Sequence, residues 1–140
     1  MKKSLLLRIT LLAMTASILA ACSGAASPSI VGDWKLASYG SPTNMTPADP
    51  NVETEITFGS DSKLNGNVGC NSFNGDYKVD GNTVTFGPIA STMMACADPM
   101  MQQEGTVFLV FTKTATFTID SSKLTITSAD GESVAVFEHK

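Results

Sequence analysis

The sequence contains almost no arginine or histidine. Its only arginine is Arg8, and its only histidine is His139, the penultimate residue. Residues 22–140 carry six lysines against thirteen aspartates and glutamates, which gives this part a net charge of −7. A chain with that charge and no guanidinium group beyond residue 8 is poorly suited to neutralise a row of phosphates, so we expect no nucleic-acid partner. Ser-His-Asp, Cys-His and multi-histidine zinc sites each need an imidazole, which the body of the chain lacks.

Long apolar runs are also scarce, and the longest lies at the N-terminus. Two lysines and Arg8 precede an uncharged stretch of 13 residues, 9–21, which is shorter than the roughly 20 residues that span a bilayer. This pattern predicts a signal peptide over residues 1–21. Its end, Leu19-Ala20-Ala21-Cys22, resembles the bacterial lipobox. That resemblance implies that Cys22 becomes the first mature residue and carries acyl chains; an ordinary signal peptide beside a coincidental cysteine is the alternative.

The rest of the chain divides into a short linker and one domain. Residues 22–29 are small and polar and predict a flexible tether. Residues 30–140 are long enough for a single domain with its own core. Ser23 follows Cys22, which resembles the pattern sorted to the outer membrane where the host has one. Otherwise we expect the domain on the outer face of the cell membrane.

Apolar and polar residues alternate over most of residues 30–140, which predicts strands. Asp80-Gly81-Asn82 marks a hairpin turn, and the last three segments predict a meander. Residues 40–52 contain three prolines and no periodicity, and predict a loop. We therefore expect an α+β fold with a small antiparallel, strongly curved or barrel-like sheet and one packed helix. The alternating segments are 33–39, 53–58, 77–79, 83–86, 115–119, 124–127 and 133–138.

One segment departs from this pattern and predicts a helix over residues 99–112. Asp98-Pro99 is typical of a helix start, with Asp98 as N-cap and proline in the first turn. A buried strand over residues 107–111 is the alternative, because Gly105 weakens a helix by about 1 kcal/mol. The stripe at helical spacing consists of Met100, Glu104, Val107 and Phe111.

Two cysteines remain once Cys22 is assigned to lipid. Cys70 and Cys96 form an even pair in a chain that we expect to be exported, which predicts a disulfide. A free reactive thiol is the alternative, but no basic residue evident beside either cysteine would stabilise its thiolate.

Two blocks of sequence surround these cysteines. The first is rich in glycine and asparagine and comprises Gly69, Cys70, Asn71, Phe73, Gly75 and Tyr77. The second comprises Thr92, Met93, Met94, Ala95 and Cys96. Together with Trp34-Lys35-Leu36 and Glu104, these blocks resemble the META-domain family, typified by HslJ-like heat-shock lipoproteins, over about residues 30–138.

The resemblance implies one small α+β domain with a curved sheet. It also implies, in general terms, a role in stress response, envelope integrity or antibiotic resistance. It implies no catalytic residues. From the residues themselves, we expect the Asn71 and Asn74 side chains to be buried and to bond loop backbone groups; recognition of a partner is the alternative.

Four methionines near Cys96 raise the hypothesis of a soft metal site. Thioethers and a thiolate suit Cu(I). We expect instead that Met93, Met94, Met100 and Met101 fill the core and that Cys96 is oxidised, so we predict no metal or other cofactor.

These observations favour a binding module over an enzyme. We expect a lipid-anchored, non-enzymatic envelope protein that acts as a monomer and binds a protein or a small hydrophobic molecule. The alternative is a secreted small protein that inhibits a protease or modulates an enzyme through the proline-rich residues 40–52.

Overall fold

The computed structural model describes residues 29–140. The predicted signal peptide, Cys22 and nearly all of the tether lie outside the described residues. The helical segments are α1 (Asp98–Phe108) and the 3-10 turn η1 (Leu109–Phe111). The strands are β1 (Gly32–Ser41), β2 (Asn44–Pro47), β3 (Glu55–Phe58), β4 (Lys63–Asn67), β5 (Ser72–Asp80), β6 (Thr83–Phe86), β7 (Ala90–Ser91), β8 (Thr114–Asp120), β9 (Lys123–Ser128) and β10 (Val134–His139).

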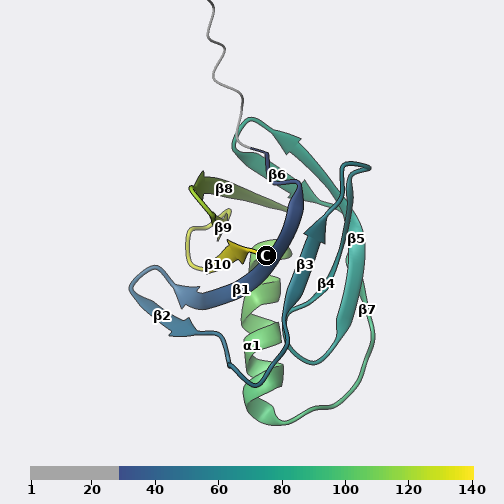
Figure 1. Cartoon of the computed structure of the whole chain (residues 1–140), viewed down its shortest axis with the longest axis vertical. Helices are drawn as coiled ribbons and strands as arrows, with labels where there is room; N and C mark the ends of the chain where they lie inside the picture. The colour runs from purple at the N-terminus through teal and green to yellow at the C-terminus, as the bar shows by residue number, and fades with distance from the viewer. Residues whose placement is uncertain (1–28) are drawn as a thin grey trace, which may run out of the picture.

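Eight of these strands form a closed antiparallel barrel. Each pairs with the next in the order β1, β3, β4, β5, β6, β8, β9 and β10, and β10 pairs back with β1. Two short strands lie off this path: β2 continues as a hairpin from β1, and β7 pairs with β5 beyond the end of β6 (Figure 1). The predicted α+β fold with a barrel-like sheet and one packed helix is confirmed.

The alternation seen in the sequence places one face of every barrel strand inside. In β1, Trp34 and Leu36 are buried, and the Trp34 indole N–H donates to the Ile30 carbonyl oxygen at 2.9 Å. Phe58 and Phe137 are fully buried within the same core. Burial of each such ring contributes about 1.5–3 kcal/mol, so the closed barrel supplies most of the domain's hydrophobic stabilisation.

The helix α1 follows β7 in the chain. It buries Val107 and, in η1, Val110 and Phe111 against the barrel core. The predicted helix is confirmed, but Ala97 rather than Asp98 is its N-cap, so Asp98 lies in the first turn. Its last turn tightens to 3-10 geometry and ends at Phe111, because Thr112 is already extended. No helix within residues 29–140 is long and apolar enough to cross a membrane.

Three short strands were missing from the sequence prediction. The predicted proline-rich loop over residues 40–52 contains β2, which pairs only with β1, so Pro47 lies on an edge strand where proline is tolerated. The β4 strand contains Gly66, where an added Cβ would overlap the Glu55 carbonyl oxygen on β3. The third, β7, has only two residues.

Candidate functional site

The loop between β4 and β5 is fastened to α1 by a buried carboxylate. Glu104 is only 6% exposed, and its Oε2 accepts hydrogen bonds from the Cys70 backbone N–H at 2.7 Å and from the Asn71 backbone N–H. Its Oε1 accepts from the Asn71 side-chain amide at 2.8 Å. Three donors thus satisfy this carboxylate, which forms no ion pair within residues 29–140, and the loop is held at a fixed distance from the helix.

Asn71 extends this network to the segment that precedes the helix. Its Oδ1 accepts from the Thr92 hydroxyl at 2.9 Å and from the Met94 backbone N–H at 2.7 Å. The expectation of a buried asparagine that bonds loop backbone is confirmed for Asn71, whereas Asn74 is exposed on β5. The two sequence blocks therefore meet in space through one amide side chain.

A covalent bond joins the same two blocks. The predicted disulfide between Cys70 and Cys96 is present, with the Cα atoms 5.9 Å apart. Gly69 lies next to it, where an added Cβ would stand 2.6 Å from the Glu104 Cβ and 2.7 Å from the Met100 carbonyl oxygen. Only glycine therefore allows the loop to approach the helix this closely.

The remaining motif residues support the barrel wall. Phe73 is buried, with its ring centroid 5.3 Å from that of Phe108. An added Cβ at Gly75 would stand 2.6 Å from the Ile89 side chain, so the glycine makes room for the segment leading to β7. Tyr77 packs on Phe58 and donates its hydroxyl to the Gly59 carbonyl oxygen at 2.7 Å. The Ala95 side chain is exposed.

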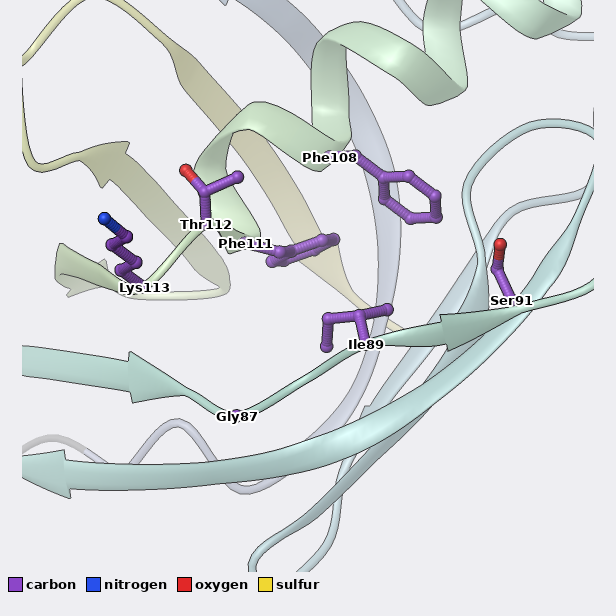
Figure 2. A pocket seen from close by; sticks show the side chains of 7 residues that line it. All are labelled: Gly87, Ile89, Ser91, Phe108, Phe111, Thr112 and Lys113. Carbon is purple, nitrogen blue, oxygen red and sulfur yellow. The ribbon is translucent and has the colours of Figure 1, made fainter.

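An open apolar groove, lined by none of these motif residues, lies between β7 and η1, and we call it the β7–η1 groove. Its volume is about 490 Å³. In Figure 2, Phe108 and Phe111 project from the helical side, and Ile89 and Ser91 lie on the opposite wall. The complete lining is Gly87, Ile89, Ser91, Phe108, Phe111, Thr112 and Lys113. Lys113 is its one titratable group, so the groove offers apolar contact and a single cation.

Sequence reasoning did not foresee this groove. It placed Phe108 and Phe111 on the helix but gave no role to Ile89, Ser91 or Lys113. The available signal was Gly87-Pro88 directly after a strand, because proline interrupts sheet pairing.

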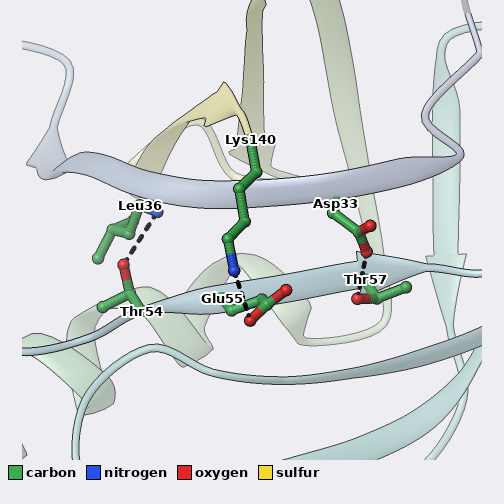
Figure 3. A network of polar contacts seen from close by, with 6 residues as sticks. All are labelled: Asp33, Leu36, Thr54, Glu55, Thr57 and Lys140. Atoms are coloured by element: carbon green, nitrogen blue, oxygen red, sulfur yellow. Dashed lines mark hydrogen bonds and ion pairs between the residues drawn. The ribbon is translucent and has the colours of Figure 1, made fainter.

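A second polar cluster joins β1 and β3 on the outside of the barrel (Figure 3). The Thr57 hydroxyl donates to the Asp33 carboxylate at 2.6 Å, and the Leu36 backbone N–H donates to the Thr54 hydroxyl at 3.1 Å. Lys140 forms an ion pair with Glu55 at 3.0 Å. The Leu36–Thr54 bond is buried and the other two contacts are exposed, and together they fasten the first and last segments of the domain to a neighbouring strand.

The expectation that the methionines fill the core is wrong for most of them. Met93 is 98% exposed, and Met94 and Met101 are also exposed. Because Cys96 is bonded to Cys70, the Cu(I) hypothesis loses its thiolate. Within residues 29–140, no group of three or more His, Cys, Asp or Glu side chains is placed to hold a metal ion.

The hydrogen bonds of Glu104 to Cys70 and Asn71 form a latch between helix and barrel. The closed eight-stranded barrel, the helix α1 and this latch define a small helix-bearing β-barrel domain. The chain belongs to the META domain family, whose model matches residues 28–140. The family resemblance seen in the sequence is thereby confirmed.

Solved structures share this fold at low sequence identity. An NMR structure of a protein from Burkholderia xenovorans matches with a TM-score of 0.64 and 18% identity, over 78% of this chain and 81% of that one. A second NMR structure matches with a TM-score of 0.59 and 23% identity, over 77% and 88% of the two chains. A crystal structure of a DUF4847 family protein from Bacteroides vulgatus gives 0.55 and 16%, over 78% and 92%. No curated protein matches the sequence.

Proposed function

We propose that this chain is a non-enzymatic, lipid-anchored protein of the cell envelope whose META domain binds an apolar group in the β7–η1 groove. The charge pattern of residues 1–21 and the lipobox-like residues 19–22 support export and anchoring through Cys22. A contribution to envelope stress tolerance or antibiotic resistance rests on the family resemblance. We further propose that the domain acts as a monomer.

The groove itself is the observation that carries binding. Phe108, Phe111 and Ile89 give it an apolar lining in a domain whose core is otherwise packed, and its volume falls within the roughly 300–1,000 Å³ of ligand sites. The latch around Glu104 holds the helix and the β7 segment on either side of it. The groove is therefore supported on both walls, as a binding site requires.

Protease inhibition through residues 40–52 is less well supported. β2 is paired along its whole length with β1, and the Ala48 backbone N–H donates to the Ala37 carbonyl oxygen at 2.9 Å. The buried Gln103 then accepts from the Asp49 backbone N–H at 2.8 Å. The segment is thus bound to the barrel and the helix, whereas an inhibitory loop must be free to enter a protease cleft.

A neutral fluorescent probe tests the groove. N-phenyl-1-naphthylamine is titrated into the mature chain carrying Cys22→Ser, and into the same chain with Ser91→Arg, which places a charged side chain in the groove. We expect saturable fluorescence enhancement that Ser91→Arg abolishes. Thr118→Arg is the matched control, since Thr118 is an exposed strand residue on β8 outside the groove lining. Equal enhancement in all three proteins, or none in any, would rule out binding at this groove.

A further inference from the structure

One wall of the β7–η1 groove is the edge of a strand. β7 pairs with β5, and the Thr92 backbone N–H donates to the Ser72 carbonyl oxygen at 3.0 Å. Successive residues of a strand direct their backbone groups to opposite sides. Ala90 and Thr92 therefore bond β5, and the N–H and C=O groups of Ile89 and Ser91 face the groove. Among the described strands, none pairs with that side of β7.

The edge is unpaired because the barrel wall divides at this point. β6 pairs with β8 as far as Thr85 and Thr114, and the Phe86 N–H then donates to the Lys113 carbonyl oxygen at 2.6 Å. Beyond that bond the chain on the β8 side is helical, in η1 and α1. A strand edge thus faces a helix across an apolar groove, which is the arrangement that accepts an added peptide strand.

The groove ends at a cation. Lys113 lines the end where β6 and β8 meet, and no ion pair involves it among the described residues. Residues 29–140 are strongly acidic, with six lysines, Lys113 included, against thirteen carboxylates. In Figure 2 the Lys113 ammonium points away from Ile89 and Phe108, but the flexible four-carbon stem of this exposed lysine lets it turn toward an anion at the end of an apolar ligand.

We propose that the β7–η1 groove binds the extended C-terminal end of a partner polypeptide. The peptide backbone pairs with the free edge of β7, its last apolar side chain lies among Ile89, Phe108 and Phe111, and its terminal carboxylate pairs with Lys113. The proposal rests on the proposed function and names the partner of that same site.

A peptide terminus fits the groove better than two other ligands. A fatty acid supplies the carboxylate and the apolar chain but leaves the backbone groups of Ile89 and Ser91 without partners. An internal peptide segment satisfies the strand edge but brings no carboxylate to Lys113. Of these three ligands, only a C-terminal peptide segment matches the free edge of β7, the apolar lining and the Lys113 cation together.

Selection from a synthetic library of octapeptides with free C-termini tests the proposal. The full mature chain carrying Cys22→Ser serves as bait, and fluorescence anisotropy measures the enriched peptide and its C-terminal amide. We expect enrichment of an apolar last residue and about fivefold weaker binding of the amide, the scale of one solvent-accessible ion pair. Lys113→Gln should bind acid and amide equally well, while the control Lys78→Gln, an exposed lysine on β5, keeps the preference.

Backbone methylation distinguishes strand addition from simple burial. A series of peptides is made, each N-methylated at one position. We expect methylation to weaken binding at every second position only, because only those N–H groups face β7. An equal effect at all positions, no acid preference, or no enriched peptide would overturn the proposal. If the neutral naphthylamine still binds and Ser91→Arg still abolishes it, the proposed function stands without a peptide partner; if neither binds, both fail.

Discussion

At the scale of single residues, two glycines on either side of the latch respond to a methyl group in opposite ways. At Gly69 the methyl would meet the Glu104 Cβ and the Met100 carbonyl oxygen, whereas at Gly105 it would meet nothing within 4 Å. We expect Gly69→Ala to lower the free energy of unfolding by about 2 kcal/mol through overpacking. Gly105→Ala should raise it by about 0.5–1 kcal/mol, because alanine favours the helix. Urea denaturation measures both, and a stable Gly69→Ala variant would show that the loop can retreat from the helix.

The Tyr77 phenol makes the free energy of unfolding depend on pH in the alkaline range. Burial raises the pKa of Tyr77 above its ordinary value, and the negative charge of Asp61 raises it further. As pH rises past about 10, the unfolded chain loses this proton first, so the free energy of unfolding falls. Tyr77→Phe loses the hydrogen bond to Gly59, which lowers the free energy of unfolding by about 1 kcal/mol at neutral pH. As pH rises past about 10, the free energy of unfolding of this variant should fall less steeply than that of the natural chain. Urea midpoints between pH 8 and 11 give the two slopes, and equal slopes would contradict this.

Single side chains also show what the sequence can reveal. The burial of Trp34 and the disulfide partners follow from local pattern and from cysteine number. The exposure of Met93 does not, because it depends on where the segment before the helix lies relative to the barrel. The role of Asn71 was predicted in kind, but its partner Glu104 is 33 residues away and could not be derived from spacing.

At the scale of elements, the disulfide fastens the segment between β7 and α1 to the barrel. The two cysteines are 26 residues apart, and the loss of chain entropy corresponds to about 3.5 kcal/mol. We expect the double variant Cys70→Ser, Cys96→Ser to have a free energy of unfolding lower by that amount, and therefore a lower melting temperature. Adding reductant should bring the natural chain to the same melting point and leave the double variant unchanged. Two alkylatable thiols in the non-reduced natural chain would contradict this.

The elements that the sequence predicted are those with strong periodicity. β1, β6 and the β8–β10 meander were found because each alternates over several residues. β4 was missed because it contains Asn65, Gly66 and Asn67, residues that rarely form strands. Its Gly66 is required by the proximity of β3, which is a tertiary contact. The helix was found, but its 3-10 end depends on how Val110 and Phe111 enter the core.

At the scale of the whole molecule, anchoring through Cys22 is the prediction with the simplest test. Two or more acyl chains give a stable anchor, whereas an unmodified chain has none. Cys22→Ser should therefore move the protein from the membrane fraction to the soluble fraction after cell disruption. Ser23→Ala serves as the control and should stay with membranes. A Cys22→Ser protein that remains membrane-bound would show that the lipobox interpretation is wrong.

The groove belongs to this scale as well, and it could not be read from the sequence. It exists because the wall divides between β7 and η1, segments about twenty residues apart that approach only once the barrel has closed. Strand periodicity predicts which residues face inward, but it gives no information on where a sheet lacks a neighbour.

The pairing of β1 with β10 has one more consequence. Trp34 lies opposite His139, and the Lys140 backbone N–H donates to the Asp33 carbonyl oxygen at 3.0 Å, so the first and last described strands run side by side. A short linker can therefore join residue 140 to residue 30, and new termini can be opened at the exposed Gly81 turn between β5 and β6. The domain is thus suited to circular permutation, which would keep every barrel pairing and move the start of the chain from residue 30 to the Gly81 turn.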